Sequence, residues 1–126
     1  MKKYYINDII KFIDNLKLGD VIDSNIIHEY IEYIHGSRDF INGKLPKRIH
    51  MYEKYELVNS NISDLNINEY YLFDDLVDRY SKQTKKTGYY PPIVISHDNR
   101  IIDGNHRSNA LNSLGIKYIK SFKGIK

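Results

Sequence analysis

A proline pair followed by a run of β-branched residues is the feature that most constrains the fold of this chain. Pro91 and Pro92 favour an extended backbone, and the Ile-Val-Ile run over residues 93–95 is typical of a buried strand. The elements predicted after the proline pair are, in chain order, a strand over 93–95, a hairpin turn over 97–99, a returning strand over 100–102, a helix over 105–114 and a strand over 117–122. Strands and helices alternating in this way predict an α+β fold.

The N-terminal part is predicted to be helical. Apolar residues recur at helical spacing over residues 4–17 and 25–35, and a cap at Asp23 or Ser24 begins the second helix. Two short helices around a turn can form a helix-turn-helix or a helical hairpin that covers a sheet, and we favour the hairpin. Residues 36–50 are expected to be an irregular connection.

The predicted organisation is a helical N-terminal extension over residues 1–50 and an α+β domain over residues 51–126. A strand around residues 52–58 begins the second part, and a long helix over 70–85 follows it. The sheet is expected to be small and mixed, and the N-terminal extension is expected to pack on it or to cover its cleft.

Composition and charge exclude several classes of function. The chain has no cysteine, which excludes disulfides, thiolate zinc sites and cysteine nucleophiles. The net charge of +3 is unevenly spread, since residues 81–126 hold nine Lys/Arg and two Asp/Glu, a local balance of +7. This cationic third suits a polyanion or a phosphorylated small molecule, or else forms a solvated lysine face. Charged residues interrupt the apolar start of the chain, so we expect a cytoplasmic protein without a membrane partner.

One segment carries candidate chemistry: residues 103–108, Asp-Gly-Asn-His-Arg-Ser, between a strand and a helix. Such a turn directs unpaired backbone N–H groups outward at the positive end of a helix dipole, which favours an anion. Arg107 and Ser108 would add donors to phosphate, and His106 could donate or move a proton. Asp103 could hold Mg²⁺ or act as a general base. The structural alternative is that Asp103 only caps the helix while His106 and Arg107 lie in solvent.

The segment from Leu57 to Phe122, and above all residues 101–119, IIDGNHRSNALNSLGIKYI, resembles the ParB/sulfiredoxin-like superfamily. The resemblance implies a bound nucleotide, ATP, ADP or CTP, with its phosphates on Gly104, Asn105, His106, Arg107 and Ser108. Gly104, Arg107 and Ala110 match the Gly-x-x-Arg-x-x-Ala pattern of the partition proteins, although His106 stands where they carry a first arginine. Without cysteine, sulfiredoxin chemistry is excluded.

The same resemblance suggests how chemistry would proceed. Members with an Asp-Gly-x-His-Arg turn include free-serine kinases, and in these kinases a glutamate after the first strand is thought to activate the hydroxyl. Glu69 lies at about that place in the sequence. Alternatively, it is only an acidic residue in the first turn of a helix, where the helix dipole favours a negative charge. The expected function is thus a Mg²⁺-dependent phosphotransferase or nucleoside triphosphatase, with Asp103, His106 and Glu69 as catalytic residues and Asp103 as the metal ligand.

Two alternatives stay open. The first is a ParB-like protein that binds DNA through the basic C-terminal third, including a nuclease. The second is a small phage or mobile-element protein that binds a host protein. Weaker candidates are His28 and His35, which lie seven residues apart and cannot by themselves clasp one zinc ion, and a basic cluster of Lys44, Lys47, Arg48 and His50.

Overall fold

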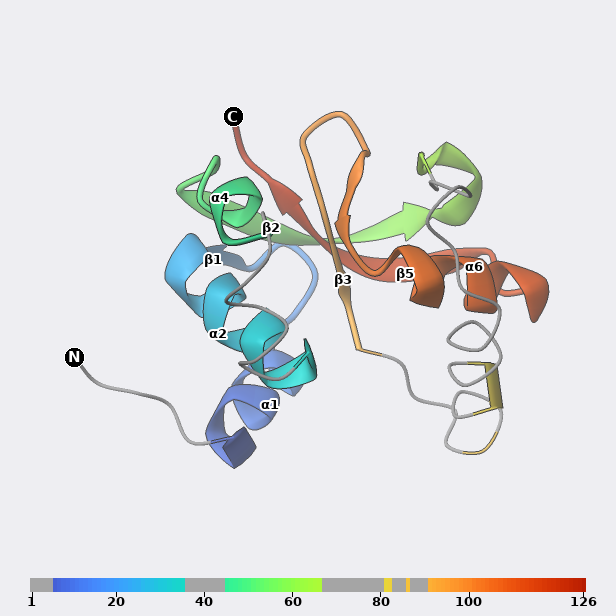
Figure 1. Cartoon of the computed structure of the whole chain (residues 1–126), viewed down its shortest axis with the longest axis horizontal. Helices are drawn as coiled ribbons and strands as arrows, with labels where there is room; N and C mark the ends of the chain where they lie inside the picture. Colours follow the sequence, from blue (N-terminus) through green and yellow to red (C-terminus); the bar gives the residue numbers. More distant parts are fainter. Residues whose placement is uncertain (1–5, 36–44, 67–80, 83–85, 87–90) are drawn as a thin grey trace.

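A computed structural model of the chain has a five-stranded mixed sheet with helices packed against it (Figure 1), which confirms the α+β fold class. The structure describes residues 6–35, 45–66, 81–82, 86 and 91–126. The predicted helix over 70–85 falls largely outside these residues, as does Glu69. Within the described part, no helix has both the length and the apolar character needed to cross a membrane.

The helices and strands follow one another along the chain in a simple order. They are α1 (Ile6–Asp14), β1 (Val21–Asp23), α2 (Ser24–His35), α4 (Leu45–Ile49), β2 (Lys54–Asn61), a 3-10 turn (Ile62–Asp64), β3 (Ile93–Ile95), β4 (Ile101–Asp103), α6 (Asn105–Ser113) and β5 (Tyr118–Gly124). The predicted hairpin turn lies between β3 and β4, with Asn99 at a φ of 67°. The elements predicted from residue 93 onward are therefore confirmed within a few residues of their expected bounds.

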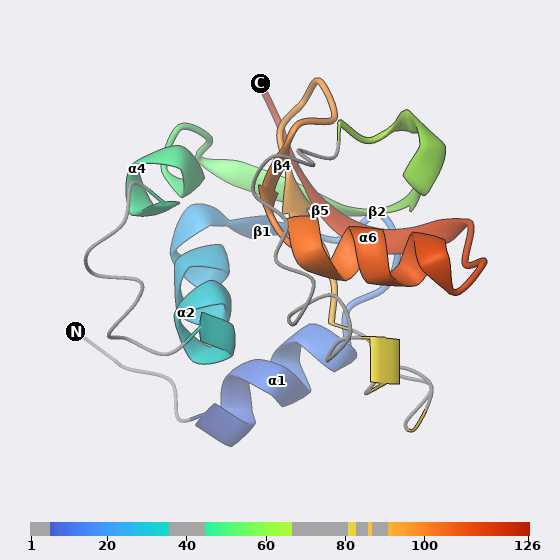
Figure 2. The same cartoon turned by 45° about the vertical axis from the view of Figure 1, so that its right-hand side comes forward.

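The sheet order is β1-β2-β5-β3-β4, so the last strand of the chain lies at the centre of the sheet. β5 is antiparallel to β2 and parallel to β3, while β3 and β4 form an antiparallel hairpin. The chain reverses direction in the β3–β4 hairpin, and α6 then connects β4 to β5, so β5 runs parallel to β3 (Figure 2).

Two features of the N-terminal part differ from the sequence prediction. The extension is not purely helical, because its residues 21–23 form β1 and pair with β2 in register Ile22 to Tyr55. The connection expected to be irregular contains the short helix α4. Pro46 suits the first turn of a helix, and burial of Ile49 holds the element in place. Both elements are too short for periodicity to reveal them.

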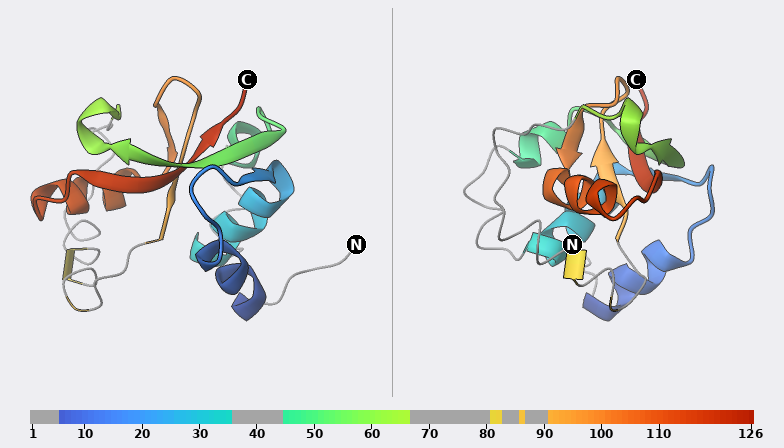
Figure 3. Two further views of the ribbon diagram at one scale, coloured as in Figure 1. Left: turned by 180° about the vertical axis from the view of Figure 1, so that it is seen from behind. Right: turned by 90° about the vertical axis from the view of Figure 1, so that its right-hand side faces the viewer.

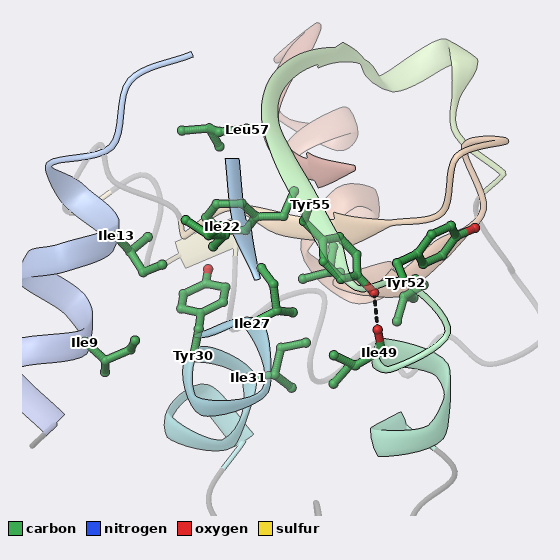
Figure 4. Close-up of a cluster of buried hydrophobic side chains, with 13 residues drawn as sticks. Ile9, Ile13, Ile22, Ile27, Tyr30, Ile31, Ile49, Tyr52, Tyr55 and Leu57 are labelled. Atoms are coloured by element: carbon green, nitrogen blue, oxygen red, sulfur yellow. Dashed lines mark hydrogen bonds between the residues drawn. The ribbon is translucent and has the colours of Figure 1, made fainter. Parts of the chain in front are cut away.

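Two clusters of apolar side chains fill opposite faces of the sheet. Leu57, Phe122 and Val94 are paired across three strands and belong to the first cluster, which α1, α2 and α4 complete (Figure 4). Ile93, Ile95 and Ile119 alternate with them along the strands and join Leu111 of α6 in the second. The predicted helical hairpin covering a sheet is therefore present, although β1 lies between its two helices (Figure 3).

Local sequence explains how the elements around the N-terminal cluster begin. Asp23 caps α2, because its Oδ1 accepts from the backbone N–H groups of Asn25 at 3.0 Å and Ile26 at 3.2 Å.

A buried hydrogen bond joins α4 to β2. The hydroxyl of buried Tyr55 donates to the carbonyl oxygen of Ile49 at 2.6 Å (Figure 4). Burial raises the pKa of Tyr55 well above its usual range, so this hydroxyl stays a donor. The bond ties the end of α4 to β2.

Candidate functional site

The turn between β4 and α6 is built around Gly104. Its φ of 109° and ψ of 21° lie in the left-handed region, where residues with a side chain are strained. A Cβ atom at this position would also lie 2.3 Å from Cγ2 of Ile93. Glycine is thus required both by the backbone conformation and by close packing of the turn on β3.

Asp103 and Arg107 form a buried ion pair directly below this turn. Nη2 of Arg107 lies 2.7 Å from Oδ2 of Asp103, and their side chains are 4% and 6% exposed. Nη1 of Arg107 also donates, at 3.4 Å, to the carbonyl oxygens of Pro91 and Pro92. From the sequence, Arg107 is expected either to bind phosphate or to lie in solvent. In the structure its guanidinium is buried and connects the end of β4, α6 and the start of β3.

This network extends to the N-terminal helices. The hydroxyl of Tyr30, a fully buried residue of α2, donates to the same carbonyl oxygen of Pro92. The proline carbonyl therefore accepts from α2 and α6 together. Nothing in the local sequence pattern marked Tyr30 or the Pro92 carbonyl, because both act through contacts between distant segments.

The remaining residues of the turn divide into buried and accessible groups. Ser108 is fully buried, and its hydroxyl donates to the carbonyl oxygen of Gly104 at 2.9 Å. Gly104, Asn105 and His106 are half-buried and reach the surface. Of the residues predicted to bind phosphate, these three are the ones whose atoms reach the surface.

The first turn of α6 has the electrostatics of an anion site. Gly104 stands at the N-cap and offers no side-chain oxygen to the backbone N–H groups of the first helical turn. Those groups and the helix dipole place partial positive charge at the surface beside Asn105 and His106. Because the charges of Asp103 and Arg107 offset each other beneath the turn, the nearby carboxylate repels an anion less than its formal charge suggests.

The donor set is not suited to a resident Mg²⁺ ion. Asp103, the predicted metal ligand, is 7% exposed and would have to leave Arg107 to bind a cation. Within the described ranges, no group of three or more His, Asp or Glu residues is arranged to hold a metal. Glu69, the second acidic candidate, lies outside these ranges.

Two other polar groups lie outside this turn: His97 of the predicted hairpin, and the basic cluster of residues 44–50. His97 belongs to the β3–β4 hairpin, where its Nδ1 is 2.7 Å from the hydroxyl of Tyr52, which also accepts from the His97 backbone N–H at 3.1 Å. Its role in the structure is therefore to anchor the hairpin. In the basic cluster of residues 44–50, Nη2 of Arg48 donates to the carbonyl oxygen of Ile101 at 3.1 Å. That bond joins α4 to the edge strand β4.

Comparisons with known proteins give partial structural similarity and no family assignment. No protein-family model matches the chain. The search of curated proteins finds no match either. Among solved structures, the chain is similar to a Pnob8-like ParB-N domain, at 19% sequence identity and a TM-score of 0.47. The match covers 55% of this chain and 29% of the other chain.

Proposed function

We propose that this chain binds the phosphates of a nucleotide at the turn between β4 and α6, and that it acts as a nucleoside triphosphatase or phosphotransferase. The observation that carries the proposal is the glycine-capped N-terminus of α6 with Asn105 and His106 half-exposed beside it. Backbone N–H groups at such a position favour phosphate oxygens through both hydrogen bonding and the helix dipole.

The residues of the turn would divide the work according to burial. The N–H groups of the first helical turn and the side chains of Asn105 and His106 would contact the phosphates. Asp103 and Arg107 would hold the turn in shape, because direct contact of Arg107 with a phosphate requires that it leave a 2.7 Å ion pair. This assignment differs from the sequence expectation, in which Arg107 was a primary phosphate ligand.

For a chemical step, His106 is the accessible group of the turn that can exchange a proton near neutral pH. Asp103 could serve as a base only after separating from Arg107. Because the described residues do not form a Mg²⁺ site, no step of this proposal uses a protein-held metal, and Mg²⁺ enters the experiments as the usual companion of a nucleoside triphosphate.

Thermal stability in the presence of nucleotides tests the binding step. ATP, ADP and CTP are added separately, each with and without Mg²⁺, and unfolding is followed by fluorescence. A ligand at one hundred times its dissociation constant stabilises the folded state by about 2.7 kcal/mol. Stabilisation by at least one nucleotide is the expected result. No stabilisation by any of them up to millimolar concentration would refute the proposal.

Variants at the two ends of the same helix locate the site. Asn105→Ala and His106→Ala should each weaken binding of the stabilising nucleotide by about 1.5–3 kcal/mol, the range for a hydrogen bond to a charged group. Asn112→Ala is the matched control, because Asn112 is an exposed asparagine near the other end of α6. Equal affinities for all three variants would show that the nucleotide binds elsewhere.

Nucleic-acid binding is the second candidate, and the exposed cations of the C-terminal third favour it. Lys117, Lys120 and Lys126 are exposed on and beside β5, and Tyr118 on the same strand is 52% exposed. Contacts with several phosphates make affinity fall steeply as salt increases. We would measure binding of a fluorescent DNA duplex between 50 and 200 mM salt, concentrations over which such contacts cost orders of magnitude in affinity. A steep slope would favour this candidate over a mononucleotide site.

A further inference from the structure

Two histidines face each other where α2 meets α4. Nδ1 of His28 lies 2.8 Å from Nε2 of His50, and the two ring centroids are 5.1 Å apart with the planes tilted by 38°. His28 comes from the middle of α2, and His50 directly follows α4. The contact therefore joins two segments that are 22 residues apart in the sequence.

In each ring, the far nitrogen, which is the one outside the His28–His50 contact, also has a polar neighbour. Nδ1 of His50 lies 3.0 Å from the hydroxyl oxygen of Ser24, and Nε2 of His28 lies 3.8 Å from Oε2 of Glu32. Ser24, His28 and Glu32 follow one another at four-residue intervals along α2, so they share one face of this helix. Metal-binding histidines have this arrangement, in which a hydroxyl, carbonyl or carboxylate beside the far nitrogen orients the ring.

Burial favours the neutral form of the His28 ring. Burial, and next the proximity of His50, lower the pKa of His28 below its usual value, while Glu32 and Glu29 act in the opposite direction. A neutral imidazole is the form that binds a metal. The side chain of His28 is 32% exposed and His50 is exposed, so an ion can reach the pair from solvent.

We propose that His28 and His50 together bind one divalent transition-metal ion of the Cu²⁺ or Ni²⁺ class. Nδ1 of His28 and Nε2 of His50 would be the two protein ligands. Two nitrogens about 2.0 Å from one ion and at right angles to each other are about 2.8 Å apart, which is the geometry of adjacent ligands in a square-planar or tetragonal site. The two rings in the structure already have this spacing. Water would fill the other positions, since the described residues place no third acidic or histidine ligand there.

The protons can be accounted for without a charged intermediate. Without metal, one ring donates its proton to the other across the 2.8 Å contact. If His50 is the donor, its proton can move to Nδ1 when the metal binds, and Ser24 then accepts this hydrogen bond instead of donating it. Each imidazole keeps one proton, and the two rings turn so that both lone pairs point to the ion, which lies to one side of the line that joins the nitrogens. Binding should therefore weaken below neutral pH, where protons compete for the same nitrogens.

Titration of the untagged, metal-free chain with Cu²⁺ or Ni²⁺ alone tests the proposal. Isothermal titration calorimetry should show one ion per chain, and the electron paramagnetic resonance spectrum of the Cu²⁺ form should show coupling to two nitrogen nuclei. His28→Gln and His50→Gln should each weaken binding at least about tenfold, since even loss of an orienting partner typically costs 10–100-fold. Ser24→Ala should weaken it by about tenfold, and it leaves the α2 cap on Asp23 unchanged.

His35→Gln is the matched control, because it also removes one histidine from α2. It should leave the affinity for the metal ion unchanged. If the His28 and His50 variants bind as tightly as the parent chain, or if the wild-type spectrum shows no coupling to two nitrogens, the proposal is wrong. The spectrum of the unmodified chain decides the question even if one variant fails to fold.

Discussion

The β4–α6 turn and the α2–α4 junction both bring charged or titratable groups together, but they do so in opposite ways. In the turn, Asp103 and Arg107 lie 2.7 Å apart with almost no exposure. In the junction, His28 and His50 lie 2.8 Å apart, with His28 partly exposed and His50 exposed. The ion pair is shielded from solvent, whereas the two histidines are exposed enough to exchange protons or to accept an ion.

The difference shows that a motif-like sequence does not identify which of its residues meet a ligand. The Asp-Gly-Asn-His-Arg-Ser segment has the most conspicuous chemistry in the chain, yet its charged pair maintains the fold. The histidine junction has no local motif, yet its two side chains are partly or fully exposed. Burial distinguishes residues that hold the fold from residues that meet a ligand. Separating a buried ion from its partner is costly, whereas separating an exposed group from its partner is not.

The largest expected effect is on the stability of the turn. Arg107→Ala leaves the buried carboxylate of Asp103 without its cation and should reduce the free energy of unfolding by about 3–5 kcal/mol, the cost of breaking a buried pair. Urea denaturation followed by circular dichroism measures this. The double variant Asp103→Leu with Arg107→Met should recover much of the loss, because it removes both charges and retains apolar volume. A loss under 1 kcal/mol in the single variant would show that the pair is open to solvent.

The next largest loss in the free energy of unfolding is expected for Gly104→Ala. The left-handed backbone conformation costs a residue with Cβ about 1–2 kcal/mol, and overpacking against Ile93 typically adds about 1–3 kcal/mol. Gly115→Ala is the matched control, since it has a φ of 80° but no heavy atom within 4 Å of the added Cβ. Urea titrations of both variants should therefore differ by the packing contribution alone. Equal losses would show that Ile93 moves aside.

A smaller effect is expected from Tyr55→Phe, where β2 meets α4. This change removes the hydrogen bond that joins β2 to the carbonyl of Ile49 and should cost about 1 kcal/mol, a typical contribution for one buried hydrogen bond. Amide hydrogen exchange should show faster opening of residues 45–49 than of α6 in this variant. Uniform acceleration throughout the chain would instead indicate that α4 unfolds only with the whole molecule.

The smallest effect is the pH dependence contributed by His28. Its pKa is lower in the folded chain than the usual value of about 6.5, so above that pH both folded and unfolded states are neutral at this residue. As pH falls through 6.5, the unfolded chain takes up the proton first, and the stability of the fold decreases until the pH is below the folded value. Urea midpoints between pH 7.5 and 5 should show this decrease, and His28→Gln should reduce it. If the urea midpoint of the variant changes with pH as much as that of the parent chain, the pH dependence does not come from His28.

Local patterns were sufficient for most elements and for part of the candidate site. The β-branched run at 93–95, the turn at 97–99 and the helix after Gly104 each depend on neighbours in the sequence, so they were predicted. β1 and α4 were missed because three paired residues and five helical residues are too short for a periodic signal. Helical spacing groups His28 with His35, whereas the packing of α4 brings His50 to His28.

By itself, the sequence determined the α+β fold class, the strand-glycine-helix turn and the absence of thiol chemistry. These depend on backbone preferences and residue types, which act over a few positions. Only the tertiary structure decided that β5 lies between β2 and β3, that Arg107 is buried against Asp103, and that His28 meets His50. Such contacts depend on how distant segments exclude water together, and that free energy belongs to the packed assembly rather than to any one segment.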